Sequence, residues 1–227
     1  MDTAKGEPEN MLQLRTIETI KDAKEICGGL SRPEKLRTLD NKQFTLTYNL
    51  PAQECKLGSI LRKKEGSTCS GCYALKNRYK WPANQKAMYR RLDSIYHPLW
   101  TDAMIYLIKR QSPDFFRWLD SGDIQSMQHF ENILEVCRRT PNTKHWLPTR
   151  EIPILKKNTG TIPDNLCLRV SDLFIGKRGI KWPHYQTSGV VFNKLDATCP
   201  AHKQNNKCGD CRVCWDRSVP HVDYPFH

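Results

Sequence analysis

Segments typical of β-strands alternate with segments typical of helices along most of the chain, and this alternation constrains the possible folds more than any other feature. Strand, helix and strand in succession favour parallel β/α units, which right-handed crossovers assemble into an open sheet or a barrel. Because roughly five or six strands can be recognised, the sequence predicts an α/β protein with a reduced or incomplete β/α barrel. The expected strands are residues 43–51, 114–120, 144–149, 165–172 and 189–195, and the expected helices are residues 13–30, 83–96, 97–111, 126–140 and 151–158.

The chain is expected to consist of three parts. Residues 1–50 would hold an N-terminal helix and strand, residues 51–198 the barrel-like catalytic core, and residues 199–227 a cysteine-rich metal-binding tail packed on that core. Residues 1–13 are polar, are expected to be loosely attached, and lack the apolar core of a signal peptide. No apolar run reaches the roughly 18 residues that a transmembrane helix requires. We therefore expect a cytoplasmic protein with no membrane partner.

Positive charge exceeds negative charge by a wide margin. The 36 lysine and arginine residues outnumber the 24 aspartate and glutamate residues, which gives a net charge of +12 and an isoelectric point near 9.3. Such an excess favours a polyanionic partner such as nucleic acid, because each neutralised phosphate releases bound counterions. A basic surface that only keeps the protein soluble is the alternative. The locally dense basic segments are residues 62–64, 76–81 and 89–92.

Four of the ten cysteines lie close together near the C-terminus, with the spacing C-x8-C-x2-C-x2-C. In a reducing cytoplasm, clustered cysteines are more typical of metal ligands than of disulfides. Zinc takes four thiolates in tetrahedral geometry, and an iron–sulfur cluster takes the same ligand set. The spacing therefore predicts a metal site but leaves zinc and iron–sulfur open. The candidate ligands are Cys199, Cys208, Cys211 and Cys214, with His202, His221 and His227 as substitutes.

A second group of three cysteines lies upstream, where Cys55, Cys69 and Cys72 form C-x13-C-x2-C. Three thiolates leave one coordination position open, as in an iron–sulfur cluster that binds a further ligand. Zinc with a fourth histidine or carboxylate ligand, or ordinary loop cysteines, are the alternatives. Cys137 and Cys167 stand alone in apolar segments and are expected to be buried core thiols.

The segment FRWLDSGDIQS at residues 116–126 places two carboxylates around a Ser-Gly pair, directly after an expected strand. The C-terminal ends of barrel strands are where such folds keep their catalytic groups. Asp120 and Asp123 are therefore candidate catalytic residues, and Asp172 occupies the same kind of position after a later strand. Asp172 could act as a nucleophile, with Asp120 as a base or substrate anchor. The alternative for each carboxylate is to cap the following helix, for which Asp123 is best placed.

Several motifs, taken in order, resemble the phage family called gene product 88. They extend over roughly residues 50–227. The resemblance implies a phage origin, a location in the cytoplasm of the host cell, and a barrel-like β/α fold with cysteine-bound metal. The motifs are CSGCYALKNRY, FRWLDSGDIQS, KHWLPTRE, LRVSD and the cysteine-rich tail.

The chain also resembles tRNA-guanine transglycosylases and their phage DNA-modifying relatives, through the D-S-G segment, a later strand-end Asp and the C-terminal cysteines. This resemblance implies exchange of guanine, in DNA rather than RNA, for a 7-deazaguanine base, with Asp172 as the nucleophile and zinc at the C-terminal site. The target base would leave the stack and meet aromatic residues. The implied catalytic residues are Asp120, Asp123 and Asp172, and the implied substrate-binding residues are Ser121, Gly122, Trp118, Trp146 and Arg150.

A third resemblance, through Cys55 and the CSGCYA segment that holds Cys69 and Cys72, is to radical S-adenosylmethionine barrels. It implies an oxygen-sensitive iron–sulfur cluster at these thiols, a second cluster at the C-terminal cysteines, and modification of nucleic acid. A non-enzymatic alternative is a zinc-stabilised protein that binds nucleic acid, in which Asp120 and Asp172 have no catalytic role. We therefore expect a phage DNA-modifying enzyme that exchanges guanine, with the cluster-bearing enzyme and the binding protein as alternatives.

Overall fold

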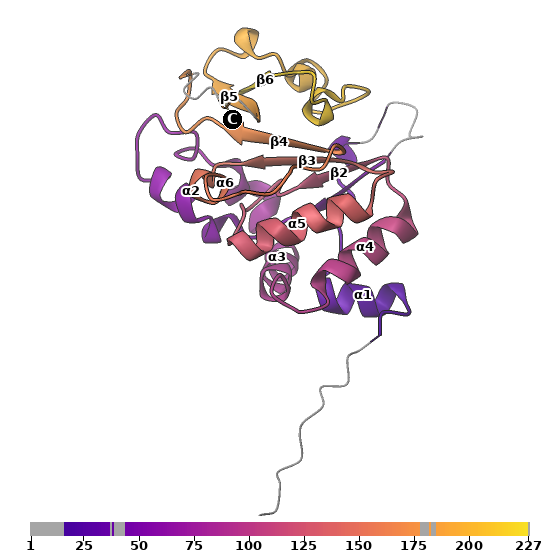
Figure 1. Cartoon of the computed structure of the whole chain (residues 1–227). Coiled ribbons are helices and arrows are strands. Elements are labelled where there is room, and N and C mark those ends of the chain that lie inside the picture. The colour runs from indigo at the N-terminus through magenta and orange to yellow at the C-terminus, as the bar shows by residue number, and fades with distance from the viewer. Residues whose placement is uncertain (1–15, 37, 39–43, 178–181, 183–184, 227) are drawn as a thin grey trace, which may run out of the picture.

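A six-stranded parallel sheet forms the centre of the molecule (Figure 1). The structure, a computed structural model, describes residues 16–36, 38, 44–177, 182 and 185–226. The strands lie in the sheet in their order along the chain, and each pair of neighbours is parallel. They are β1 (Thr45–Tyr48), β2 (Phe115–Trp118), β3 (Lys144–Thr149), β4 (Leu166–Ser171), β5 (Gln186–Val191) and β6 (His221–Pro225).

The sheet is open, because β1 and β6 form its two edges and no pairing joins them in the described part of the chain. The expectation of an α/β protein with parallel strands is confirmed, whereas a barrel is not confirmed. Right-handed crossovers between the first four strands, which lie side by side in chain order, return on the same side of the sheet. This order places the connecting helices on one face.

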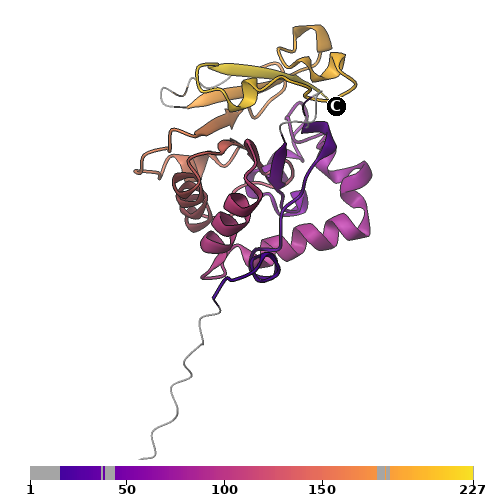
Figure 2. The same cartoon turned by 90° about the vertical axis from the view of Figure 1, so that its right-hand side faces the viewer.

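The longer helices lie on that face, and Figures 1 and 2 show them on the same side of the sheet. α4 contacts α1 and α5, and their apolar side chains join those of the sheet in one buried core. Trp118 of β2, Trp100 of α4 and Tyr48 of β1 are fully buried and in contact at its centre. The helices are α1 (Ile20–Cys27), α2 (Lys56–Leu61), α3 (Pro82–Ser94), α4 (Trp100–Gln111), α5 (Met127–Arg139) and α6 (Ile152–Leu155).

The connection between β5 and β6 (residues 192–220), which we call the C-terminal segment, covers part of the opposite face. Phe115 and Trp146 on this face pack with Cys214 and Trp215 of the segment. Arg169 of β4 is fully buried on the same side, and its guanidinium donates to backbone carbonyls, most of them in the segment. Because every donor of the guanidinium is used, Arg169 ties the segment to the sheet. The acceptors, at 2.7–3.2 Å, are the carbonyl oxygens of Val213, Cys214, Asp216, Val219 and Thr187.

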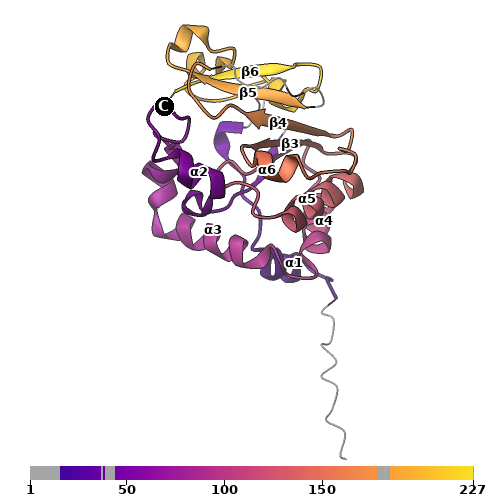
Figure 3. The ribbon, with the colours of Figure 1, turned by 60° about the vertical axis from the view of Figure 1, so that its left-hand side comes forward.

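The long connection that follows β1 runs across the edge of the sheet where the strands have their carboxyl ends. Thr68 N donates to a backbone carbonyl just beyond β4 at 3.0 Å. A Cβ on Gly71 would lie 2.5 Å from the ring of Phe226, so the connection passes directly beside the end of β6. Near β3, Glu151 Oε1 accepts a backbone N–H of α2 at 2.9 Å, and Figure 3 shows α2 beside α6. The connection thus brings its own residues to several strand ends.

Most of the expected helices and strands are confirmed, and one strand is additional. The first helix ends at Gly28, which has the left-handed φ of 78°. The sequence does not predict β6, because its alternation spans only five residues and Pro225 is typical of an edge strand. β6 is indeed at the edge of the sheet. The expectation for residues 1–13 lies outside the described residues.

Within the described ranges, no helix combines the length and the apolar character needed to span a membrane. Cys137 and Cys167 are buried, as expected for core thiols, and Cys27 is buried as well. α1 and β1 contribute to the same core as the later elements. The N-terminal helix and strand are therefore integrated into the main fold.

We expect the substitution Arg169→Ala to lower the free energy of unfolding by roughly 3 kcal/mol or more, because it leaves several buried carbonyls without donors. Urea unfolding measures this change, and limited trypsin digestion reports release of the C-terminal segment. The control is Arg138→Ala on α5, whose side chain is 43% exposed and should change stability by less than about 0.5 kcal/mol. Equal stability of the two variants would contradict the anchoring role.

Candidate functional site

The DSGD segment forms a tight turn at the carboxyl end of β2. Gly122 has φ of 82°, a left-handed conformation that favours glycine. A Cβ at this position would lie 2.6 Å from Leu50 Cβ, so the turn packs directly on the residues that follow β1. Ser121 O also accepts a hydrogen bond from Leu50 N at 3.0 Å. Close packing between two strand ends therefore requires the glycine.

Asp120 lies at the centre of a buried ionic network. Its Oδ1 pairs with Arg117 Nη1 at 2.5 Å and with Lys35 Nζ at 2.9 Å. Its Oδ2 accepts a short hydrogen bond from Tyr79 OH, and its backbone carbonyl accepts one from Tyr73 OH. Burial alone would raise the pKa of Asp120, but the two cations and the Tyr79 hydroxyl outweigh it and hold the pKa below its ordinary range. A carboxylate held in this way is a poor proton acceptor.

Asp123 is also buried, but its hydrogen-bond donors are uncharged. Oδ1 accepts from Thr149 Oγ1 at 2.6 Å and from Ile124 N at 2.8 Å, and Oδ2 accepts from Arg150 N at 2.9 Å. Burial raises the pKa of Asp123, and these hydrogen bonds only partly offset the rise. Asp123 does not cap the following helix, because the N-cap of α5 is Ser126.

Cys55, Cys69 and Cys72 lie in the connection that crosses the carboxyl edge. A Cβ on Gly58 would lie 2.8 Å from Cys55 Cβ and 3.7 Å from both Cys55 Sγ and Cys69 Sγ, so the two thiols pack against the same glycine. Cys72 N donates to Cys69 O at 3.2 Å, and this turn holds the second and third thiols together. Burial raises the pKa of Cys55, and the negative charges of Asp123 and the other two cysteines raise it further. We call these three residues the loop thiols.

Arg150 connects the loop thiols to the ends of β3 and β4. Its Nε donates to Thr68 Oγ1 at 2.9 Å and to Asp172 O at 3.3 Å. Burial raises the pKa of Cys69, and the positive charge of Arg150 opposes this rise. Arg150 therefore lowers the cost of forming a thiolate at Cys69.

The four C-terminal cysteines, the tail thiols, gather on the sheet face opposite the helices. Cys214 belongs to the apolar cluster on that face, and its Sγ lies 3.2 Å from Tyr224 OH. Burial raises the pKa of Cys214 to about 12, and the negative charges of Cys199 and Cys208 add to the rise. Burial and the charge of Cys211 likewise raise the pKa of Cys208. The tail thiols are thus close enough to affect one another electrostatically.

Positive charge surrounds Cys208. Its backbone N donates to Lys35 O at 2.9 Å. The charges of Arg117, Lys35 and Arg212 lower the pKa of Cys208, against the larger effect of burial. Because two of these cations also pair with Asp120, the ionic network joins the DSGD turn to the tail thiols. A positive environment favours the thiolate, which is the form that binds metals.

No three His, Cys, Asp or Glu side chains among the described residues are positioned to hold a metal ion. The expected zinc or iron–sulfur cluster at the tail thiols, and the second metal at the loop thiols, therefore stay predictions. Of the substitute ligands, His202 Nδ1 lies 2.9 Å from Cys199 O, and His227 lies outside the described residues. His221 Nε2 lies 2.9 Å from Asp223 Oδ1.

Asp172 follows β4 at the same edge and is 9% exposed. A Cβ on Gly189 of β5 would lie 3.0 Å from Asp172 Oδ2, 2.5 Å from Asp223 Oδ1 and 3.3 Å from His221 Nε2. Gly189 therefore leaves room for two carboxylates and an imidazole above the sheet. The role of Asp172 as a nucleophile stays a prediction.

The expected aromatic contacts for a flipped base are buried. Trp118 is fully buried in the helix-side core. Trp146 is 4% exposed beneath the C-terminal segment, where Arg117 lies 4.4 Å from its ring centre. Ser121 is buried as well, and its Oγ has no hydrogen-bond partner among the described residues. Stacking of a base on either tryptophan would require the covering residues to move.

Sequence reasoning missed the basic and phenolic side chains that surround Asp120. Arg117 had a visible signal, since it is a charged residue inside an otherwise apolar strand. Tyr73 and Tyr79 had a weaker one, since both lie within the CSGCYALKNRY motif. Lys35 had none, because it is distant in sequence from every motif of the site.

The fold and the site define a mixed α/β protein with an open parallel sheet, in which a buried ionic network lies beside two groups of thiols. The family described as gene product 88 matches residues 19–217, and the chain belongs to this family. Membership is consistent with a phage protein, as the motifs imply. No curated protein and no solved structure matches the chain. The resemblance to transglycosylases is not confirmed.

We expect Asp120→Asn to lower the free energy of unfolding at pH 7 by about 3 kcal/mol, because Arg117 loses its buried counter-charge. The folded-state pKa of Asp120 lies below its ordinary value. Its stabilisation is therefore complete above the ordinary value of about 4 and is lost as pH falls through the folded pKa. Urea unfolding at neutral and acid pH should show the difference between the proteins narrowing in acid.

The control for this prediction is Asp102→Asn on α4. Asp102 pairs with Arg139 at 2.8 Å, but its side chain is 49% exposed, so the change should cost less than about 1 kcal/mol. A difference between wild type and Asp120→Asn that stays constant or widens in acid would refute the ionised state of Asp120.

Proposed function

We propose that the chain is an iron–sulfur enzyme in which the loop thiols, Cys55, Cys69 and Cys72, hold a cluster at the carboxyl edge of the sheet. The observation that carries the proposal is the course of the connection after β1, which brings the three thiols to this edge. Parallel α/β folds place their catalytic groups at the carboxyl ends of strands. Three thiolate ligands leave one coordination position for a further ligand.

Two features of the fold support a likeness to radical S-adenosylmethionine barrels. The six parallel strands keep their chain order in an open sheet, and the cysteines follow the first strand. The likeness implies that a bound cluster would supply one electron to S-adenosylmethionine and so start radical chemistry on a substrate.

The residues around the loop thiols fit such a group. Gly58 packs against both Cys55 and Cys69, and a Cβ at this position would lie only 2.8 Å from Cys55 Cβ, so a larger side chain would push the thiols apart. The positive charge of Arg150 favours a thiolate at Cys69. Each sulfur moves by rotation about one side-chain bond, so convergence on a common centre does not require a different fold.

The chain's own residues supply the surroundings for chemistry at this edge. Arg150 is held by Thr68 and by the end of β4, and it presents positive charge beside Cys69. It is therefore suited to orient an anionic group of a substrate or cosubstrate. Asp123 is a buried carboxyl group with a raised pKa, which suits it to hold a proton at Oδ1 or Oδ2.

For the tail thiols we propose a metal, zinc or a second cluster, with a structural role. The tail thiols lie against the sheet and beside Arg117 and Lys35. A metal there would fasten the C-terminal segment over the sheet, in addition to the hydrogen bonds of Arg169.

Base exchange through Asp172 remains the alternative proposal, with less support from the geometry. Asp120, its expected partner, is engaged by two cations and a tyrosine. Trp118 and Trp146 are both buried. Replacement of Asp172 by Asn should abolish guanine exchange, while nucleic-acid binding is retained.

We expect anaerobically purified protein to contain iron and sulfide and to show a broad absorbance band near about 400 nm, the usual region for iron–sulfur clusters. Cys69→Ser should lose about four iron atoms per chain, the content of one cubane cluster. Iron and sulfide analysis and the absorbance spectrum measure both changes. Cys137→Ala removes a buried thiol from α5 and serves as the control that keeps its iron.

Zinc without a visible band in the wild-type protein would overturn the cluster proposal. Retention of the full iron content by Cys69→Ser would exclude the loop thiols as ligands. Either result would favour base exchange or nucleic-acid binding without catalysis.

We expect Cys211→Ser to lose metal independently of the loop thiols, with about one zinc ion or one cluster fewer per chain. Thermal unfolding should occur at a lower temperature, because ligand binding to the folded state adds to stability. Metal analysis of Cys211→Ser, Cys69→Ser and the double variant tests whether the two groups of thiols bind metal independently. Loss of all metal in each single variant would contradict two independent sites.

A further inference from the structure

The segment from Lys76 to Arg91 contains six basic residues and no acidic residue. It forms the 3-10 helix η4 (Asn77–Lys80) and then α3, directly after the loop thiols. Arg91 is buried and donates to Gly29 O at 2.8 Å. The other five basic side chains are exposed, namely Lys76, Arg78, Lys80, Lys86 and Arg90.

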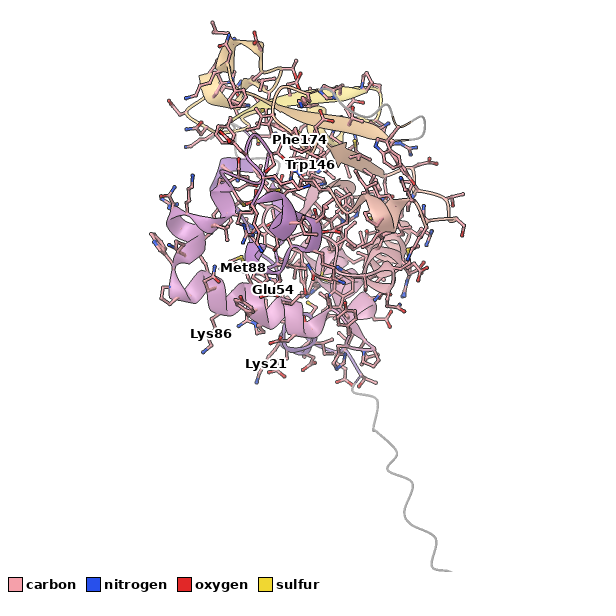
Figure 4. The ribbon with its side chains drawn as sticks, turned by 90° about the vertical axis from the view of Figure 1, so that its left-hand side faces the viewer. Lys21, Glu54, Lys86, Met88, Trp146 and Phe174 are labelled. Atoms are coloured by element: carbon pink, nitrogen blue, oxygen red, sulfur yellow. The ribbon has the colours of Figure 1, made fainter. Side chains whose placement is uncertain are left out.

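Exposed aromatic rings lie among these charges. Trp81 at the start of α3 is 58% exposed, and the Arg78 guanidinium lies 5.8 Å from its ring centre. Tyr89, farther along the helix, is 37% exposed. Lys86, Tyr89 and Arg90 share one face of α3, since they are three and four residues apart. Figure 4 shows Lys86 projecting away from the body of the molecule.

The basic surface continues into a groove between α1 and α3. The groove has a volume of about 700 Å³, and its lining includes Lys21, Lys24 and Arg90. Glu25 is the acidic residue in that lining, so positive charge predominates. Arg90 Nη2 donates to Gly28 O at 3.0 Å, which holds this side chain at the groove.

We propose that η4 and α3 bind a single-stranded nucleic acid and lead it toward the loop thiols. Exposed cations attract the phosphate backbone, and an exposed tryptophan offers a stacking surface to a base only when that base is unpaired. A helix with interleaved charges and aromatic rings matches this chemistry. The inference rests on the proposed function and extends it, because it names nucleic acid as the substrate class of the thiol site.

The placement of α3 supports delivery to that site. The short segment between Cys72 and α3 is fastened to the DSGD turn, where Tyr73 and Tyr79 both donate to Asp120. α3 has 13 residues and is therefore about 20 Å long. A strand that lies along α3 thus has one end beside the carboxyl edge of the sheet and the other at the groove.

The test is fluorescence anisotropy with a labelled mixed-sequence oligonucleotide, as single-stranded DNA, single-stranded RNA and duplex. We expect the triple variant Arg78→Ala, Lys80→Ala, Lys86→Ala to bind at least about tenfold more weakly to single strands. The negative slope of log K against log salt concentration should become shallower by about 2, since each of the three lost phosphate contacts contributes about 0.7. Trp81→Ala should weaken binding by about fivefold or more with an unchanged slope.

The matched control removes the same charge elsewhere, by Lys109→Ala, Arg110→Ala, Lys157→Ala at exposed positions. It should change affinity by less than about twofold, and circular dichroism melts confirm folding of every variant. Equal losses of oligonucleotide affinity in both triple variants would overturn the proposal. So would tighter binding to the duplex than to the single strand, or binding only to vesicles of anionic lipid.

The same titration with Cys69→Ser separates this inference from the proposed function. Binding is expected to be unchanged in this variant, because the basic surface does not include the thiols. Normal oligonucleotide binding by a wild-type protein that contains no iron would support the basic surface and reject the cluster. A wild-type protein that contains iron but binds no oligonucleotide would support the cluster and reject the basic surface.

Discussion

The strand order constrains the rest of the structure. The first four strands lie side by side in chain order, and right-handed crossovers between them place the connecting helices on a single face of the sheet. The second face needs another cover, and the C-terminal segment supplies it. Arg169 makes this possible, because its buried guanidinium satisfies carbonyl oxygens that the segment would otherwise bury without donors. The tail thiols are consequently held against the sheet.

The same strand order concentrates chemistry at one edge. Parallel strands present all their carboxyl ends together, so residues after β1, β2, β3 and β4 become neighbours although they are far apart in the chain. The loop thiols, Asp123 and Arg150 meet there. Asp120 belongs to the same turn, but its charge is balanced by Arg117 and Lys35, which makes it a poor proton acceptor. This contrast between neighbouring carboxylates is why the loop thiols, rather than an Asp pair, carry the functional proposal.

Local patterns were sufficient to predict much of this protein. The alternation of strand and helix signals predicts the parallel sheet, and the end of the first helix at Gly28 follows from its sequence. Motif order over roughly residues 50–227 indicated the family, whose model matches residues 19–217. The cysteine groups and the DSGD turn could be recognised because their residues are adjacent in sequence. β6 was missed because a short edge strand that contains Pro225 has little local signal.

Only the tertiary structure decided which of these residues meet and in what state. Arg117 pairs with Asp120 from only three residues away, but the second cation, Lys35, is 85 positions away and lies in no motif. The burial of Trp118 and Trp146, the open sheet, and the cap of α5 at Ser126 depend on packing between distant elements. The sequence by itself determined the types of elements and the chemical groups, because those follow from local periodicity and composition. Their charge states and neighbours follow from long-range contacts, which no local pattern encodes.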